Sequence, residues 1–324
     1  MPKLTLRYVS TAKLLATALL GTMLFTGIHA QAADTTTSTS ETKTRLILLG
    51  TAGGPLPKVN RSAPANVLVV NGKAYVIDAG DGVARQLIKA GVPPTSLRAV
   101  FITHHHSDHN ADYGNLLFLS WAAGLKNAVD TYGPPPLVKM TSLFLEMNDW
   151  DIQLRQREEH RPELAQLIKA HNIQGDGVVY QDENVKVTAF EVEHYGAKPS
   201  YGFRFDTPDR VIVFSGDTQR TANLIQMARN ADVLVHEVVN DEAVDRLVQR
   251  IDPGNMGLKD HIVNAHTPTT EVGKIAAEAG VKTLVLTHFV PSDGPDDKDE
   301  IWLRDVQKDF KGPVVVGRDL MEVK

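Results

Sequence analysis

Four histidines and one aspartate occupy the six residues from His104 to His109. The mostly apolar run 97–102 directly before them predicts a buried strand, so the cluster is expected on the loop at the end of that strand. On an extended segment the side chains at positions i and i+2 project to the same side, so His104 and His106 can bind one cation. Asp108 and His109 follow as the chain turns and can face a second cation. Neutral imidazole and carboxylate groups are ligands that suit zinc, and the segment therefore predicts a zinc site.

Two cations need more ligands than this segment supplies. Three lone donors follow further predicted strands, namely His194, Asp217 and His288. Taken singly, each is more readily explained as a structural polar group than as a metal ligand. Because all three stand at the ends of strands in the same chain as the histidine cluster, together they predict a dinuclear site.

The pattern Thr-His-x-His-x-Asp-His at 103–109 resembles the signature of the metallo-β-lactamase superfamily, with every ligand position filled. A redox-active diiron branch of that superfamily would carry Glu where this chain has His106, so the resemblance points to hydrolysis. Further segments resemble the ribonuclease Z-like branch, to which the secreted zinc arylsulfatases are similar: 49–55 with Arg61, 78–80, 215–218, 236–237, 265–267 and 286–289.

The resemblance implies two zinc ions held by protein ligands alone. The first ion would be bound by His104, His106 and His194, the second by Asp108, His109 and His288, with Asp217 bridging the two. An aspartate at the bridging position disfavours the true β-lactamases, which lack that carboxylate.

The chemistry expected of such a site is hydrolysis by a hydroxide that bridges the two metals. Two Zn²⁺ ions lower the pKa of a shared water from about 15.7 towards about 7, so hydroxide exists at neutral pH. Asp108 would help to orient this nucleophile, and His266 would contact the ester oxygen or protonate the leaving group. The alternative for His266 is a capping or ligand-orienting histidine. Asp78 and His236 are expected to orient ligands rather than to bind metal.

The order of apolar runs predicts an α/β fold, an αβ/βα four-layer sandwich of the metallo-β-lactamase type. The strands arrive in two blocks, each with helices, and no linker separates them, so residues 45–324 are expected to form one hydrolase domain. Asn71-Gly72 predicts a two-residue hairpin turn. The charged segment from 138 to about 171 is expected to be a helical insertion near the mouth of the site. Among the other expected elements are strands at 46–49, 178–192, 201–205, 211–214, 281–286 and 314–316, and helices at 83–90, 113–124, 221–230, 241–251 and 268–279.

The first 32 residues have the composition of a secretory signal peptide. Three basic residues precede an apolar segment at 14–28, and Ala30-Gln31-Ala32 offers a cleavage site. A membrane anchor is the alternative, but the apolar segment falls short of the roughly 20 residues needed to span a bilayer. Residues 33–44, rich in Thr and Ser, are expected to be a disordered linker. These features predict a periplasmic or secreted protein that is free of the membrane after cleavage.

Charge and cysteine content narrow the expected partners. The formal net charge is −5, and loss of the basic signal peptide would make the chain more acidic. Since nucleic-acid binding relies on clustered basic residues, this balance predicts no nucleic-acid partner. The chain has no cysteine, so any metal must be held by His and carboxylate groups. A homodimer is compatible with the resemblance.

The function expected from these observations is a secreted dinuclear zinc hydrolase of small-molecule sulfate esters, similar to arylsulfatases. A phosphodiesterase or lactonase that uses the same two metals is the first alternative. A zinc-binding protein without catalytic activity is the second, although all the ligand positions are intact. The sequence does not separate the ester classes, because the same hydroxide attacks each of them.

Overall fold

The computed structural model describes residues 44–292 and 298–324. The predicted signal peptide and the predicted linker up to residue 43 lie outside the described residues. Within the described ranges, no helix is both long enough and apolar enough to cross a membrane.

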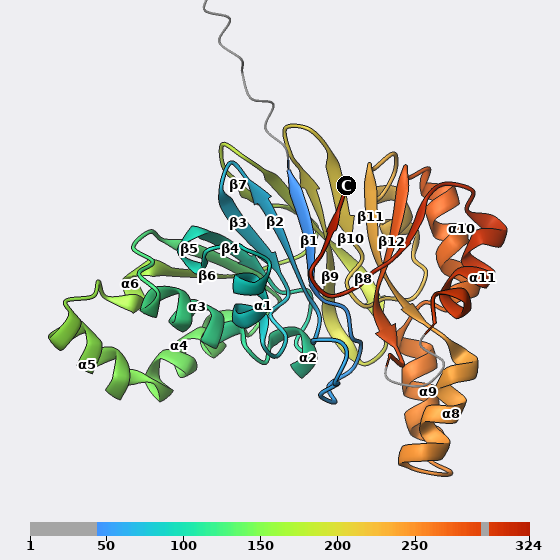
Figure 1. The fold of residues 1–324 in the computed structure, drawn as a ribbon, viewed down its shortest axis with the longest axis horizontal. Coiled ribbons are helices and arrows are strands. Elements are labelled where there is room, and N and C mark those ends of the chain that lie inside the picture. The colour runs from blue at the N-terminus through green and yellow to red at the C-terminus, as the bar shows by residue number, and fades with distance from the viewer. Residues whose placement is uncertain (1–43, 293–297) are drawn as a thin grey trace, which may run out of the picture. The chain divides into compact units, whose positions relative to one another are not determined.

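Two seven-stranded mixed sheets form the centre of the fold (Figure 1). The first sheet has the order β14-β1-β2-β3-β4-β5-β6 and the second has the order β13-β12-β11-β10-β9-β8-β7. The strands of the first sheet are β1 (Arg45–Gly50), β2 (Ala65–Val70), β3 (Lys73–Ile77), β4 (Leu97–Phe101), β5 (Val129–Gly133), β6 (Ile168–Asn172) and β14 (Met321–Val323). Those of the second are β7 (Gly177–Gln181), β8 (Lys186–His194), β9 (Ala197–Asp206), β10 (Val211–Phe214), β11 (Val233–Val239), β12 (Thr283–Val290) and β13 (Val314–Val316).

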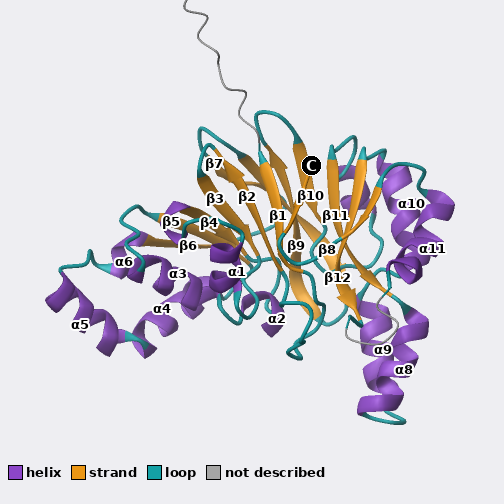
Figure 2. Ribbon diagram, viewed as in Figure 1, coloured by secondary structure: helices purple, strands orange, loops and turns teal. Residues whose placement is uncertain are grey.

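Helices cover the outer face of each sheet (Figure 2). The first half of the chain contributes α1 (Val83–Lys89), α2 (Ser107–Asn110), α3 (Tyr113–Ala122), α4 (Leu137–Met147), α5 (Asp149–Glu159), α6 (Leu164–Leu167) and a 3₁₀ turn, η1 (Pro94–Ser96). The second half contributes α7 (Ala222–Met227), α8 (Asp241–Ile251), α9 (Met256–Ala265), α10 (Thr269–Ala279) and α11 (Asp299–Asp309). The predicted four-layer αβ/βα sandwich is therefore confirmed.

Three apolar clusters correspond to the three interfaces between the four layers. One lies between the sheets, and the other two join each sheet to its helices. Alternation of side chains along the strands explains this, since successive residues face opposite sides of a sheet. In the central cluster the ring of Phe101 lies 5.5 Å from that of Phe203 and 5.2 Å from that of Phe205, measured between centroids. Phe101, three residues before His104, thus packs the first sheet against the second.

Replacement of Phe101 by alanine is expected to lower the free energy of unfolding by about 3–5 kcal/mol, because the ring is fully buried between two sheets that cannot close the gap. Urea-induced unfolding followed by circular dichroism measures the change. The matched control is Phe144→Ala, on the partly exposed helix α4, which should cost much less. An equal loss in both variants would contradict the role given to Phe101.

The hairpin predicted at Asn71-Gly72 is present between β2 and β3. Both residues have positive φ angles, 48° and 72°, as the mirror-image turn of a two-residue hairpin requires. Several other strand and helix predictions are confirmed to within a few residues, including β10 at 211–214, α8 at 241–251 and β13 at 314–316.

The predicted helical insertion at 138–171 is only partly correct. Its last residues form the edge strand β6, because they pair in parallel with β5 from Ile168 to Asn172. The helices α4, α5 and α6 lie beside the first sheet, and no residue of theirs lines the described cavities next to the predicted site. These two cavities therefore give no support to the expectation that the insertion shapes the site mouth, and that role stays a prediction.

Three further differences concern tertiary pairing. The single strand predicted at 178–192 is two strands, β7 and β8, joined by a turn in which the carboxylate of Asp182 accepts hydrogen bonds from the amides of Asn184 and Val185. The strand β11, buried along its whole length, was not among the expected elements. The helices α9 and α11 were not among the expected elements either.

Candidate metal centre

Strand direction brings the predicted donors to one edge of the sandwich. The strands β8, β10, β11 and β12 all run the same way, because β8 and β10 are each antiparallel to β9 and the others pair in parallel. Their carboxyl ends therefore meet at the same edge, where polar side chains of α/β folds commonly gather. The histidine cluster follows β4 and reaches this edge through α2 (Figure 1).

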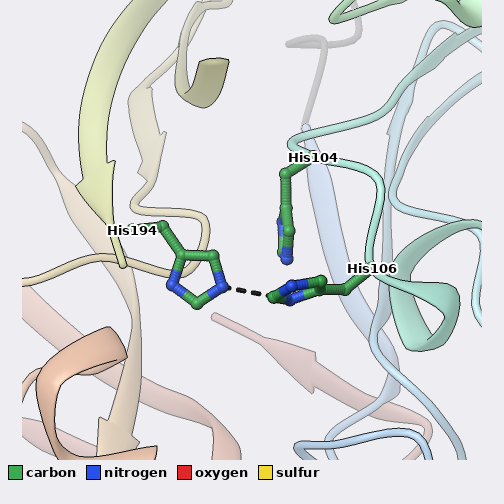
Figure 3. A group of neighbouring side chains, drawn as sticks. All are labelled: His104, His106 and His194. Carbon is green, nitrogen blue, oxygen red and sulfur yellow. Dashed lines mark hydrogen bonds between the residues drawn. The ribbon is translucent and has the colours of Figure 1, made fainter. Parts of the chain in front are cut away.

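The first group of donors comprises His104, His106 and His194, drawn in Figure 3. Their rings converge from two sheets, and Nε2 of His194 lies 3.1 Å from Nδ1 of His106. One ligand atom from each residue lies within 4.8 Å of the others. The Nε2 atom of His104 is fully buried and has no hydrogen-bond partner among the described residues. A buried imidazole nitrogen aimed at two others fits a bound cation.

The second group comprises Asp108, His109 and His288. Nε2 of His288 lies 3.1 Å from Nε2 of His109 and 3.4 Å from Oδ2 of Asp108. All three residues are buried. The amide of Gly54 donates a 2.9 Å hydrogen bond to the same carboxylate oxygen and so fixes its position.

Asp217 lies between the two groups. Its Oδ2 atom is 3.1 Å from Nε2 of His288 and 3.2 Å from Nε2 of His109. The same oxygen is 3.9 Å from Nε2 of His104 and 4.0 Å from Nε2 of His194. One carboxylate oxygen thus faces imidazoles of both groups, as a bridging ligand would. The structure brings all seven predicted donors together, and their ligation of metal stays a prediction.

Two backbone irregularities aim these donors. Glu237 pairs with Thr287 and Val238 with Phe289, which makes His288 the extra residue of a β-bulge with a φ of 45°. A bulge redirects the side chain of the extra residue. Gly216, directly before Asp217, has a φ of 61°, and a Cβ atom there would lie 2.6 Å from the carbonyl oxygen of Tyr201. Only glycine fits that position without a shift of the backbone.

Buried hydrogen bonds orient the imidazoles. Asp78 accepts from the amide of Thr103 at 2.8 Å, and its other oxygen is 2.8 Å from Nδ1 of His109. Nδ1 of His194 donates to the carbonyl of Ala265 at 2.7 Å, which leaves Nε2 free to bind metal. The orienting role expected of Asp78 agrees with this geometry. The fourth histidine of the cluster, His105, points elsewhere, with Nε2 bonded to the carbonyl of Pro134.

Electrostatics favours the cation-binding protonation states of His104, His194 and Asp217, whereas His109 must release a proton before it can bind a metal. Burial lowers the pKa of His104 and lowers that of His194 to about 4, so both imidazoles are neutral at pH 7. Burial alone would raise the pKa of Asp217, but the neighbouring His109 and His288 outweigh it and hold the pKa well below the usual value. Burial opposes a charged His109, whereas the carboxylates of Asp217 and Asp78 raise its pKa. The centre thus holds ionised carboxylates among nitrogen donors, a set that suits a divalent cation.

His266, the second predicted catalytic residue, lies at the side of this centre. Its Nδ1 atom is 3.8 Å from Oδ2 of Asp217 and 3.2 Å from Oε2 of Glu237. Burial lowers the pKa of His266, but Glu237 and Asp217 together outweigh burial and raise it to about 9. The imidazole is therefore protonated and ready to donate at neutral pH.

Glu237 forms an ion pair with His266 and was not assigned a role from the sequence. Its Oε1 atom accepts hydrogen bonds from the amides of Thr218 and Thr267, and its Oε2 atom has no hydrogen-bond partner in the described part of the chain. The orienting role was expected of His236 instead. The ring of His236 bonds only to the carbonyl of Glu237, with no hydrogen bond to a predicted ligand among the described residues. The sequence signal for Glu237 was a carboxylate next to His236 in a strand whose other five residues are apolar.

A cavity of about 340 Å³ opens onto the centre. It contains His106, Asp108, Asp217, His266 and His288 on one side. Its other lining residues come from the glycine-rich segment 53–58, from α8 and α9, and from Ser107, Val290 and Pro291. A substrate in this cavity would touch the predicted metal ligands directly.

A second cavity of about 320 Å³ lies on the other side of the segment 54–58 and shares Ser107 and Asp108 with the first. Arg85 and Lys89 line it, and both side chains are exposed. Four residues apart on α1, they lie on the same face of the helix. A local concentration of positive charge therefore stands beside the predicted metal centre, although the chain as a whole is acidic.

Comparison with known proteins places the chain among related sequences. The family model described as anti-Pycsar protein Apyc1 matches residues 44–247. A ribonuclease Z from Mycobacterium bovis (strain BCG) is 31% identical over 282 residues, which cover 86% of this chain and 97% of that protein.

Solved structures show the same fold at lower identity. The metallo-β-lactamase fold protein YhfI from Bacillus subtilis matches with a TM-score of 0.63 and 22% identity, over 86% of this chain and 98% of that one. The short form of human tRNase Z matches with a TM-score of 0.62 and 22% identity, over the same shares of the two chains.

Proposed function

We infer the function of this chain from its family, because it belongs to the ribonuclease Z-like branch of the metallo-β-lactamase superfamily and to the Apyc1 family. We propose that it is a metal-dependent hydrolase of phosphodiester bonds that acts on RNA. The observation that carries this proposal is the likeness to a ribonuclease Z over nearly the whole length of that protein. The convergence of the seven predicted metal ligands at one edge of the fold supports it.

This family membership corrects the expected substrate. The relatives are named ribonuclease Z, so the expectation of a sulfate-ester hydrolase similar to arylsulfatases is wrong. The expected periplasmic setting of that activity conflicts with the same relatives. Export itself rests on residues 1–32, which lie outside the described residues, and stays a prediction from the sequence.

The expectation that this chain has no nucleic-acid partner is also wrong, since the relatives are named ribonuclease Z, and the error has a physical reason. Net charge sums the whole surface, whereas a phosphate backbone interacts with the charges within about a Debye length, roughly 10 Å at 0.1 M salt. Arg85 and Lys89 supply positive charge beside the centre even though the net charge of the chain is −5. The expectation of a small-molecule ester as the only substrate fails with it.

We propose that the seven donors hold two divalent cations, with zinc the metal that best suits imidazole and carboxylate ligands. Bound cations would supply a nucleophile at neutral pH and would stabilise negative charge on the phosphate oxygens. The protein's own residues do the rest. Asp78 fixes the ring of His109, and the carbonyl of Ala265 fixes that of His194. Asp217 would contact both cations, and His266 would donate a proton to the departing oxygen.

The experiment that tests this proposal supplies zinc-loaded protein with a transfer RNA that carries a 3′ extension, with unstructured RNA and with bis(p-nitrophenyl) phosphate. Cleavage of RNA, with loss of activity after chelation, is the expected result. Hydrolysis of bis(p-nitrophenyl) phosphate without cleavage of either RNA would restrict the function to small phosphodiesters. Failure on all three would overturn the proposal.

The double variant Arg85→Glu/Lys89→Glu is expected to weaken RNA binding roughly tenfold or more and to flatten its salt dependence, since it removes two phosphate contacts. Fluorescence anisotropy with labelled RNA at several salt concentrations measures both effects. The control, Lys126→Glu/Lys139→Glu, changes two exposed lysines that line neither cavity. If the two double variants bind RNA equally well, the basic cavity has no part in binding.

A further inference from the structure

The cavity beside the metal centre has two chemically different walls. The predicted metal ligands form one wall. Four aliphatic side chains belong to the other wall, Leu247 and Ile251 from α8 and Leu258 and Ile262 from α9. Figure 1 shows α8 and α9 as a helical pair at the edge of the sandwich, next to the end of β12. Nothing in the metal chemistry calls for this apolar surface.

Helix caps, an ion pair and an apolar cluster hold α8 and α9 together and against the second sheet. Asn240 caps α8 by accepting from the amide of Ala243, and Asn255 caps α9 by accepting from the amide of Leu258. Lys259 pairs with Asp245 across the two helices at 2.5 Å. Below them, a separate apolar cluster of Val239, Val244, Val248 and Val290 joins the pair to the second sheet. The wall is therefore held in position before a substrate arrives.

Two of the four wall residues serve the interior as well, and two are available to a ligand. Leu258 and Ile262 also pack against the small apolar cluster. Leu247 is only partly buried, and Ile251 is 45% exposed although it lines the cavity. Apolar side chains left open beside a reactive centre mark a binding surface rather than core.

We propose that this wall binds one nucleobase of the substrate, next to the phosphodiester that is cleaved, and that it does so without reading the identity of the base. The proposal rests on the proposed function and names the part of the RNA that the cavity takes. A cavity of roughly 150 Å³ already holds a benzene ring. The 340 Å³ cavity thus has room for one base with its ribose.

The lack of base reading follows from the chemistry of the wall. Proteins distinguish single-stranded bases by hydrogen bonds to the base edges, and four aliphatic side chains offer neither donors nor acceptors. They can only cover the flat apolar face of the base, which every base presents. His261 stands at the same cavity with its ring 6.2 Å from that of His106, where it can stack on a base of any kind.

The test uses competitive inhibition of bis(p-nitrophenyl) phosphate hydrolysis by zinc-loaded protein. The inhibitors are the four nucleoside monophosphates, as 5′ and 3′ isomers, together with ribose 5-phosphate and ribose 3-phosphate. In the tighter-binding series, the four inhibition constants are expected to agree within about threefold, and the sugar phosphate without a base is expected to inhibit at least about tenfold more weakly.

Ile251→Ser and Leu247→Ser should each raise the inhibition constants of the nucleotides towards that of the sugar phosphate, because each removes apolar surface that covers the base. Met256→Ser is the matched control, since Met256 is 58% exposed on the same helical pair and does not line the cavity. All of its inhibition constants should stay at the wild-type values.

The outcomes separate this proposal from the function on which it rests. Equal inhibition by nucleotides and sugar phosphate overturns the base site, while turnover of the chromogenic phosphodiester keeps the proposed function in place. A preference of tenfold or more for one base overturns the claim that base identity goes unread. Absence of turnover overturns the proposed function itself.

Discussion

Asp217→Ala is expected to lose bound zinc and to lower kcat/KM for phosphodiester hydrolysis by about 100-fold or more, because this carboxylate faces imidazoles of both donor groups. Even residues that only orient metal ligands cost about 10–100-fold when they are changed. The Oδ2 atom of Asp217 lies within 4.0 Å of nitrogen atoms from four imidazoles in both groups, so its removal leaves two half-sites without a bridge. Zinc content by atomic absorption and turnover on the same preparation measure the two effects.

His106→Ala separates the two half-sites. It removes one of three donors from the first group and leaves Asp108, His109 and His288 in place, so zinc content is expected to fall towards one ion per chain. Asp260→Ala, an exposed carboxylate on α9, is the control and should keep the full zinc content. Wild-type zinc content in both Asp217→Ala and His106→Ala would falsify the dinuclear assignment.

Glu237→Gln is expected to lower kcat by about 100-fold while zinc content stays at the wild-type level. Proton donation by a placed side chain is worth about 10²–10⁴ in rate. Glutamine keeps the shape of the residue and can still accept the hydrogen bonds of Thr218 and Thr267 through one oxygen. It removes the negative charge that stands 3.2 Å from the ring of His266.

The pH profile shows whether Glu237 acts through His266. Burial lowers the pKa of His266 and the carboxylate of Glu237 raises it, so loss of that charge moves the pKa down from about 9. A proton donor with a lower pKa is lost at lower pH, so the alkaline limb of kcat should shift to lower pH. Glu193→Gln is the control, because Glu193 forms an exposed ion pair with Lys198. If Glu237→Gln and His266→Ala have fully additive effects on kcat, the two residues act independently and this account is wrong.

The seven candidate metal ligands could be located from the sequence because each one interrupts or ends an apolar run. The segment 104–109 and Asp217 follow strands, His194 is the last residue of β8, and His288 lies near the end of β12. Polar residues at the end of a strand either reach solvent or meet at the sheet edge. The fold followed from the same runs. Glu237 was harder to find, because a buried acid inside a strand has no periodic signal, and its value depends on a histidine 29 positions later that only folding brings near.

Other features had no local signal at all. The strand β6 exists because β5 offers it an edge, and its residues alone favour a helix as readily. The sequences of α8 and α9 have the pattern of ordinary amphipathic helices. Only the folded structure shows that part of their apolar face lines the cavity and is not covered by other residues. The substrate class was mistaken because a net charge carries no information about where Arg85 and Lys89 lie.

The contact between Glu237 and His266 has a consequence for how such enzymes diversify. Everything between these two residues, from the end of β11 through α8 and α9, leaves the body of the fold and returns to within 3.2 Å of where it departed. A segment with anchored ends can be lengthened, shortened or exchanged if the carbonyl of Ala265 at its end keeps its hydrogen bond to His194, since loop closure costs little more for a longer loop. Replacement of α8 and α9 by a different helical pair between Glu237 and His266 could therefore change substrate selectivity while the predicted metal ligands stay the same.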